Sequence, residues 1–117
     1  MTPTAELREE LRELLDEVIP EAGTEGDTRF TDAQLDRILS KSRNIYVAAA
    51  EGWTRKAAMF QRELGQVQSY MVGQERYDLA KASELLEYAL KMAETYSRMA
   101  TSSMGSVILK FKPPEVL

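Results

Sequence analysis

Apolar residues recur at three- and four-residue steps along most of the chain, which is the period of an amphipathic helix. The first such stretch predicts a helix that begins near Thr2, with Pro3 at its first position, and ends at Pro20. On its polar face Arg12 can pair with acidic neighbours three and four residues away, but like-charged pairs outnumber the favourable ones. The helix is therefore expected to depend on packing of its apolar stripe, which consists of Leu7, Leu11, Leu14, Leu15 and Val18.

A polar loop separates this helix from the next one, whose start signal is the clearest in the sequence. Thr31 can cap the helix, and Gln34 completes a capping box three residues later. Phe30 can pack against Leu35 as a hydrophobic staple. The polar cluster at 40–44 is expected to end this second helix.

A third helix is predicted from Asn44 to Leu64, with Trp53 and Phe60 in the core. Small residues on several of its sides would let other helices approach closely, so it is expected to be the central helix. Gly52 lies inside it and costs roughly 1 kcal/mol relative to alanine. Close packing of a neighbouring element is the expected compensation, and Gly65 is expected to end the helix.

The remaining chain alternates between extended and helical patterns. Gly65–Asp78 alternates imperfectly and predicts an extended loop or a short hairpin, and Leu79–Ala100 predicts the last helix. A flexible link, Thr101–Gly105, then precedes a short apolar run. The predicted fold is thus all-α, a small four-helix bundle at 1–100 followed by a linker and an extended C-terminal docking arm at 101–117.

Composition narrows the possible chemistry. The chain has 117 residues, 44% of them hydrophobic, which suits one domain with a sizeable core. It has neither cysteine nor histidine, so disulfides, thiolate or imidazole metal sites and histidine acid–base catalysis are excluded. The carboxylates of the first helix spread over a solvent face rather than forming a site. We therefore predict no catalytic residue, metal or cofactor, and hence no enzyme; an enzyme would need a site built from carboxylates, Lys and Tyr alone.

The membrane and secretory classes also receive no support. The longest apolar run has six residues, at 45–50, whereas a bilayer-spanning helix needs about 20. The first residues are acidic and contain no apolar signal region. We therefore expect no membrane partner.

Charge is distributed unevenly along the chain. Residues 1–22 hold seven acids against two arginines, whereas 40–64 hold five basic residues against two acids. We expect these two regions to lie close together, within one chain or between neighbouring copies, although two independently solvated helix faces would give the same pattern. The candidate inter-subunit charges are Glu9, Glu13, Arg55 and Lys56.

The basic residues of the middle region are also compatible with DNA binding as an alternative function. The two helices joined at 40–44 could form a helix-turn-helix. The formal net charge of −4 and the largely apolar third helix argue against this alternative. The basic residues concerned are Lys41, Arg43, Arg55, Lys56 and Arg62.

The C-terminal run is mostly β-prone and lies beyond the predicted linker. Such a segment can add a strand to a neighbouring sheet or fill a groove on a partner, with a frayed terminus as the alternative. Pro113 and Pro114 would stop further strand pairing. The candidate partner-binding residues are Val107, Ile108, Leu109, Lys110, Phe111 and Lys112.

Four segments taken in order resemble the head–tail connector (adaptor) proteins of long-tailed bacteriophages. They read FTDAQLDRIL, YVAAAEGWTRKAAMF, GQVQSYMVGQERY and LLEYALKMAETY, and the similarity covers Leu7 to Met99. The resemblance implies a helical-bundle subunit of a ring, usually dodecameric, that attaches below the portal, extends the DNA channel and offers a platform for the stopper or tail. It also implies that the loop before the last helix faces the tail, with Gln68, Tyr70, Val72 and Gln74 as candidates.

The resulting functional expectation is a virion structural protein. Its partners would be the portal protein, a stopper or tail-completion protein and further copies of itself, and DNA would pass without sequence-specific binding. Its location would be the head–tail interface, after assembly in the host cytoplasm. The alternative is a small DNA-binding regulatory or packaging protein.

Overall fold

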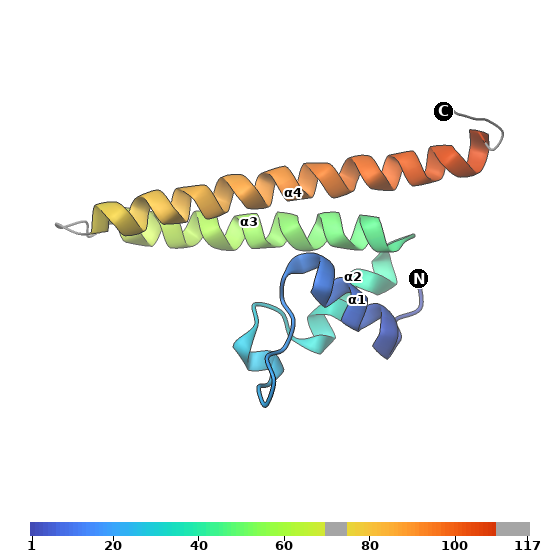
Figure 1. Cartoon of the computed structure of the whole chain (residues 1–117), viewed down its shortest axis with the longest axis horizontal. Coiled ribbons are helices and arrows are strands. Elements are labelled where there is room, and N and C mark those ends of the chain that lie inside the picture. The colour runs from blue at the N-terminus through green and yellow to red at the C-terminus, as the bar shows by residue number, and fades with distance from the viewer. Residues whose placement is uncertain (70–74, 110–117) are drawn as a thin grey trace.

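Four α-helices and one short 3-10 turn make up the described chain. The computed structural model describes residues 1–69 and 75–109, with side chains for 1–66 and 80–102. No strand occurs among these residues, which confirms the all-α prediction. The elements, shown in Figure 1, are α1 (Ala5–Leu15), η1 (Glu25–Asp27), α2 (Asp32–Lys41), α3 (Ile45–Ser69) and α4 (Glu75–Leu109).

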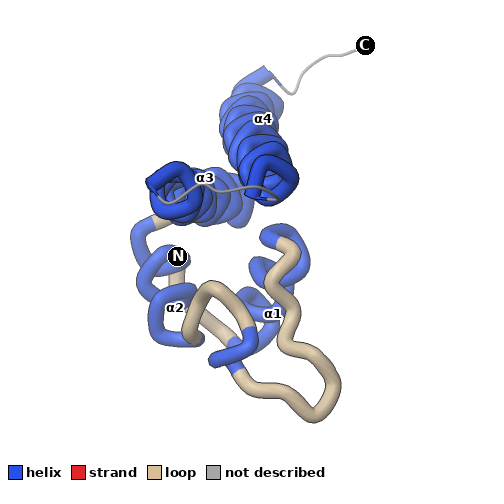
Figure 2. Tube along the Cα trace, turned by 90° about the vertical axis from the view of Figure 1, so that its left-hand side faces the viewer, coloured by secondary structure: helices blue, strands red, loops and turns tan. Residues whose placement is uncertain are grey.

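The two longest helices determine the shape of the molecule. α3 and α4 lie side by side and antiparallel as a long hairpin, and α1 and α2 pack together below α3 (Figures 1 and 2). Each of the other three helices contacts α3, so the predicted central helix is confirmed. The molecule is elongated, with principal extents of 58 × 33 × 23 Å.

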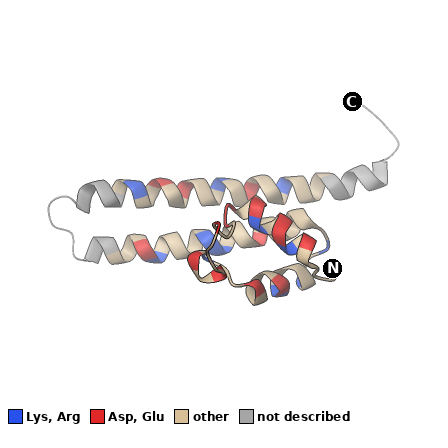
Figure 3. Cartoon of the chain, turned by 60° about the horizontal axis from the view of Figure 1, so that its bottom comes forward, with Lys and Arg blue, Asp and Glu red and all other residues tan. Residues whose placement is uncertain are grey.

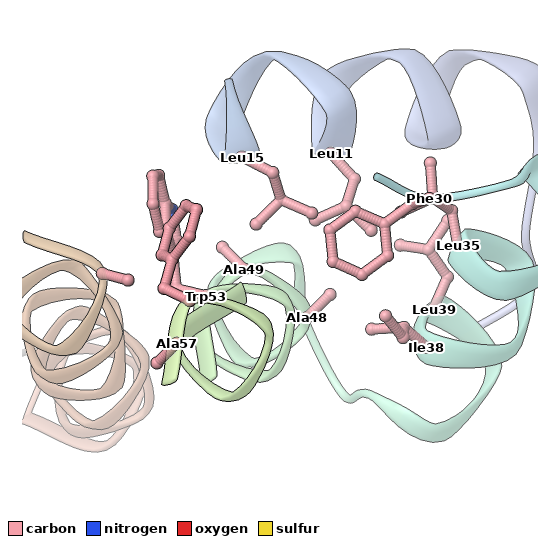
Figure 4. Close-up of a cluster of buried hydrophobic side chains, with 12 residues drawn as sticks. Leu11, Leu15, Phe30, Leu35, Ile38, Leu39, Ala48, Ala49, Trp53 and Ala57 are labelled. Atoms are coloured by element: carbon pink, nitrogen blue, oxygen red, sulfur yellow. The ribbon is translucent and has the colours of Figure 1, made fainter. Parts of the chain in front are cut away.

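The core lies where α1, α2 and α3 meet and continues between α3 and α4 (Figure 4). Trp53 and Phe60 are buried, as predicted. Gly52 allows α1 to approach α3 closely, because a Cβ built on it would lie 2.6 Å from both Cδ atoms of Leu15. The expected compensation for a glycine inside α3 is therefore confirmed. The buried cluster consists of Leu11, Leu15, Phe30, Leu35, Ile38, Leu39, Ala48, Ala49, Trp53, Ala57, Phe60 and Ala89.

α1 is shorter at both ends than the sequence predicts. Thr4 caps its N-terminus and accepts a 3.1 Å hydrogen bond from the backbone N–H of Leu7, so Pro3 precedes the helix. Asp16 ends it in a left-handed conformation with φ of 59°, and its N–H bonds back to the carbonyl oxygens of α1's last turn. Pro20 therefore lies beyond the helix end rather than causing it. Val18, predicted to belong to the apolar stripe, is half-exposed.

The start of α2 follows the local signals in the sequence. Thr31 and Gln34 form the predicted capping box, and Phe30 and Leu35 are both buried in the same cluster. The predicted interruption is confirmed as well, because α2 ends at Lys41 and α3 begins at Ile45. Asn44 caps α3 by accepting hydrogen bonds from two backbone N–H groups, each 2.9 Å long.

The hairpin helices are longer than predicted. α3 continues through Gly65 to Ser69, and α4 begins at Glu75, so the extended segment expected at 65–78 is wrong for 65–69 and 75–78. Residues 70–74 lie outside the described chain. A Cβ built on Gly65 meets nothing within 4 Å, so this glycine marks neither a turn nor a close contact. One glycine costs only about 1 kcal/mol, which a long packed helix tolerates.

α4 also continues through the stretch predicted to be a flexible linker. It runs without a break to Leu109, so 101–105 and the beginning of the predicted extended arm are helical. The hydroxyl of Thr101 bonds to the carbonyl oxygen of Ser97 one turn earlier, at 3.2 Å. Ser and Thr can satisfy their hydroxyls on the helix itself in this way, so a polar run need not end a helix.

Candidate functional site

The predicted contact between the acidic first segment and the basic middle is present within the chain. Lys56 of α3 is buried and forms a 2.8 Å ion pair with Glu17, which follows α1. Its ammonium group also donates to the carbonyl oxygen of Leu15 at 2.7 Å and lies 4.2 Å from the centre of the Trp53 ring. Lys56 is therefore not available for the contact between copies that the sequence suggested.

Two α3 side chains cap the C-terminus of α1. The Trp53 indole N–H donates to the carbonyl oxygen of Leu14 at 3.0 Å, beside the bond from Lys56 to Leu15. The last carbonyl groups of a helix have no partner within it, and a cation there also complements the helix dipole. The end of α1 is thus fixed by residues about 40 positions later in the chain.

Arg12 fixes the loop between α1 and α2. It is almost fully buried, although an amphipathic reading placed it on the polar face of the first helix. Its guanidinium donates to the carbonyl oxygens of Glu17 and Phe30, each at 3.0 Å, to the Thr28 hydroxyl at 3.0 Å, and to the Asp32 carboxylate at 2.9 Å. One feature of the sequence is consistent with this burial: Arg12 lies three residues before Leu15, at the edge of the apolar stripe.

A second arginine ties the same loop to α3. The Arg29 guanidinium pairs with Glu63 at 2.8 Å and lies 4.5 Å from the centre of the Phe60 ring. Its backbone N–H donates to the second carboxylate oxygen of Glu17 at 2.9 Å. Glu17 therefore receives one bond from α3 and one from the loop, and its carboxylate is part of the interior rather than a surface charge.

The other candidate inter-subunit charges lie on the surface. Glu9 and Glu13 are exposed on α1 and form no ion pair with a described residue. Arg55 pairs at 2.8 Å with Glu51, one turn earlier on α3. Red acidic positions are concentrated on α1 and the loop after it (Figure 3). These three residues stay candidates for a contact with another molecule.

One hollow of the described surface is lined by residues of α2, α3 and α4. We call it the groove; its volume is about 480 Å³, within the range of binding sites. Its lining includes Ile38 and Lys41 of α2, Val47 and Ala50 of α3, and Ala93 of α4, with the remaining lining residues Ser42, Glu51, Thr54, Arg55 and Ser97. Small residues on α3 and α4 leave this space open. The sequence analysis named Lys41 and Arg55 only for their charge and did not find the groove.

A second feature is a strip of apolar side chains on α4. Leu85, Tyr88 and Met99 are 39%, 48% and 39% exposed, and Met92 is half-buried between them. The spacings of three, four and seven residues place all four on one side of the helix. We call these four residues the α4 strip. Ala89 and Ala100 of α4 are buried, whereas most of the strip is exposed, so only part of the apolar surface of α4 packs inside the chain.

The aromatic residues of α4 connect this strip to the core. Tyr88 meets Trp53 edge to face, with ring centres 5.5 Å apart, and Tyr96 stacks on Tyr46 at 6.4 Å. Burial raises the pKa of the Tyr96 hydroxyl, and the nearby Tyr88, Asp16 and Tyr46 raise it further because each disfavours another negative charge. This hydroxyl stays protonated and therefore acts as a neutral packing group.

The remaining predicted site residues lie at the ends of the hairpin helices. The backbone of Gln68 belongs to α3, and Val107, Ile108 and Leu109 form the last turn of α4. Tyr70, Val72 and Gln74, like 110–112, lie outside the described residues.

Metal and membrane chemistry find no support in the part of the chain that the structure describes. No cluster of three or more acidic residues there is arranged to hold a metal ion. None of the described helical segments is both long and apolar enough to cross a membrane. Comparison of the chain with protein-family models, curated proteins and solved structures finds no match.

Proposed function

We propose that this protein is a non-enzymatic virion component, a ring-forming adaptor between the portal and the tail of a long-tailed bacteriophage. The proposal comes from the ordered resemblance of four sequence segments to that class of protein. Three of them coincide with structural units: the capped α2, the core-forming part of α3, and the middle of α4. The proposed partners are the portal protein, a stopper or tail-completion protein and further copies of the chain.

The observation that supports an assembly role is the presence on one small chain of two surfaces, the groove and the α4 strip, that no described residue covers. A ring subunit must contact a neighbour on each of two sides through different surfaces. An adaptor also needs no reaction chemistry, and the polar network around Lys56 is fully used in holding α1, the loop and α3 together.

The test of this function is the composition and behaviour of virions from the phage that carries the gene. Mass spectrometry should find the chain in purified particles, cross-linked to the portal protein and to other copies of itself. Disruption of the gene should yield DNA-filled heads without attached tails. Particles that lack the chain, or tailed particles in its absence, would refute the adaptor role.

The predicted docking arm calls for a matched pair of truncations. A chain that ends at Gly105 lacks the last turn of α4 and everything after it, whereas a chain that ends at Leu109 keeps that turn. If the arm attaches the adaptor, both chains should fold with unchanged helicity per residue and neither should join heads to tails. Normal joining by the shorter chain would show that the arm is dispensable.

DNA binding is the second candidate, and the structure changes how it should be tested. Lys56 is buried and Arg55 is paired, but Lys41 and Arg43 are exposed next to the short α2–α3 connection and form no ion pair with a described residue. Neutralising Lys41 and Arg43 should abolish salt-sensitive duplex binding if this candidate is correct. If the protein does not bind duplex DNA at low salt, this second candidate function is wrong.

A further inference from the structure

The loop between α1 and α2, residues 17–29, is held in place without a buried apolar side chain of its own. Glu17 is buried, and every residue from 18 to 29 is exposed or half-buried. The flanking helices differ, because Leu15 of α1 and Leu35 of α2 are fully buried. Segments with few buried apolar contacts open most readily in a folded protein. The loop therefore depends on polar contacts for its closed position.

Two ion pairs fasten this loop to α3. Glu17, at its start, pairs with Lys56, and Arg29, at its end, pairs with Glu63, each at 2.8 Å. Lys56 and Glu63 are seven residues apart, so they lie on one side of α3, two turns from each other. The pair at Glu63 is exposed to water, which weakens it. Opening the loop rehydrates both charges of the buried pair at Lys56, which offsets part of the lost attraction.

Further hydrogen bonds hold the loop to α1 and α2. Arg12 donates to the Thr28 hydroxyl at 3.0 Å and to the carbonyl oxygen of the loop's first residue, also at 3.0 Å. The Glu25 carboxylate accepts a 2.5 Å bond from the backbone N–H of Asp32. Arg12 also bonds to the Phe30 carbonyl oxygen and the Asp32 carboxylate, which lie outside the loop. α1 and α2 can therefore stay joined through Arg12 while the loop moves.

The loop covers apolar side chains of α3. Cζ of Arg29 lies 4.5 Å from the centre of the Phe60 ring, and Nη1 lies 4.0 Å from the sulfur of Met59. Phe60 follows Trp53 by seven residues, which places both on the same side of α3. Trp53 in turn meets Tyr88 of the α4 strip edge to face. The covered residues therefore continue, along α3, the apolar surface that begins at the α4 strip.

The backbone of this region is also strained. Ala22 has a φ of 65°, and Asp16, immediately before the loop, has a φ of 59°. Both are left-handed conformations, which are unfavourable for residues that carry a Cβ atom. Gly23, which could adopt such a conformation freely, follows Ala22 but is not itself left-handed. Opening of the loop relieves this strain, so the polar contacts must maintain the closed position against it.

We propose that the loop between α1 and α2 is a releasable cover: it opens while helices α1–α4 stay folded, and its opening exposes the side of α3 that carries Phe60 and Met59. In the closed state, Arg29 shields this side from water and from other molecules. In the open state, the uncovered side chains join the exposed apolar surface around Tyr88. The loop thus regulates how much apolar surface the molecule presents.

This device does not depend on the proposed adaptor role. Its tests use the purified chain in solution, whereas the adaptor role is tested in virions. Either proposal can therefore be overturned while the other stands.

Hydrogen exchange followed by NMR spectroscopy tests whether the loop opens separately from the helices. The backbone N–H of Arg29 donates to the Glu17 carboxylate, and that of Thr28 donates to the Glu25 carbonyl oxygen. Exchange at both amides therefore requires the loop to open. We expect their protection factors to be at least about tenfold lower than those of the α2 amides, and to be unchanged by low concentrations of urea. The same protection and the same urea dependence as the α2 amides would overturn the proposal, because the loop would then open only when the whole protein unfolds.

The absence of cysteine from the chain lets a single thiol report whether α3 is uncovered. Met59→Cys places the thiol beneath Arg29, and Ala58→Cys, at the preceding and exposed position of α3, is the matched control. In the full-length chain, the Met59→Cys thiol should react with a maleimide at least about tenfold more slowly than the Ala58→Cys thiol. Equal rates would overturn the proposal, because the closed loop would then not cover this side of α3.

Two further changes should shift the opening in opposite directions. Glu63→Gln removes an ion pair from the closed loop and should speed the labelling of Met59→Cys about two- to fivefold, whereas Glu51→Gln, which removes a similarly exposed pair elsewhere on α3, should not change it. Ala22→Gly relieves strain in the closed loop and should slow the labelling at least about twofold. All three side chains are exposed, so the variants should keep the circular dichroism spectrum of the parent. If Glu63→Gln has no larger effect than Glu51→Gln, or if Ala22→Gly does not slow the labelling, the proposal is wrong.

Discussion

The energetic importance of the close approach of α1 to α3 can be measured by replacing each of two glycines of α3, Gly52 and Gly65, with alanine. A Cβ at Gly52 would lie 2.6 Å from both Cδ atoms and 3.1 Å from Cγ of Leu15, whereas a Cβ at Gly65 meets nothing within 4 Å. Both changes to alanine gain the same helix propensity, at most about 1 kcal/mol. Only Gly52→Ala must also move a fully buried leucine, and overpacking of this kind costs about 1–3 kcal/mol.

The difference between the two variants isolates the clash, because the propensity gain is common to both. We expect Gly65→Ala to raise the free energy of unfolding by about 0.5–1 kcal/mol. Gly52→Ala should be about 1–3 kcal/mol less stable than Gly65→Ala. Urea unfolding can be followed by circular dichroism and by the fluorescence of the single tryptophan, Trp53, which lies next to Gly52. Equal m-values in all variants would show that the comparison concerns stability alone.

A third variant tests whether the Leu15 side chain causes the destabilisation of Gly52→Ala. Leu15→Ala should be costly in the parent, by about 2–5 kcal/mol, but less costly when Gly52→Ala is present, because the smaller side chain leaves room for the added methyl group. If Gly52→Ala proves as stable as Gly65→Ala, or if the two changes at Leu15 and Gly52 are additive, the packing explanation for Gly52 is wrong.

Three further predictions concern the polar interior and the half-buried Tyr96. Lys56→Met should lower the free energy of unfolding by about 3–5 kcal/mol because it leaves the buried Glu17 carboxylate without its cation. Adding Glu17→Gln should recover part of that loss in a double-mutant cycle. A loss below about 1 kcal/mol for Lys56→Met would contradict the role assigned to the ion pair. Arg12→Met should lower the free energy of unfolding by at least about 3 kcal/mol, because buried acceptors lose their donor. It should also increase backbone hydrogen exchange in the loop between α1 and α2. Unchanged exchange in that loop would show that Arg12 does not fix it. The pKa of Tyr96 is raised, so the stability that its neutral hydroxyl contributes should be present below about pH 10 and be lost as the pH rises through the folded-state pKa. Tyr96→Phe should therefore flatten the decline in unfolding free energy that urea titrations measure between about pH 8 and 11. The same decline in the parent and in Tyr96→Phe would contradict this prediction.

Local signals determined much of the helical organisation. The capping box at Thr31 and Gln34 and the break between α2 and α3 lie in a few adjacent residues, and the structure has both where the sequence predicts them. The burial of Trp53 and Phe60 follows from a period that neighbouring turns reinforce. Such features are predictable because the interacting groups lie within one or two helical turns of each other.

Partners distant in the sequence decided the remaining features. α1 ends at Leu15 rather than near Pro20, with its last carbonyl groups bonded to Trp53 and Lys56 of another helix. The groove likewise needs three helices to exist, so no single segment indicates it. A carbonyl or a charge is buried only where a distant residue completes its hydrogen bonds. The sequence by itself therefore determined where α2 and α3 begin and which residues form the core of α3. The tertiary structure decided where α1 stops, which charges enter the interior and which apolar side chains of α4 stay exposed.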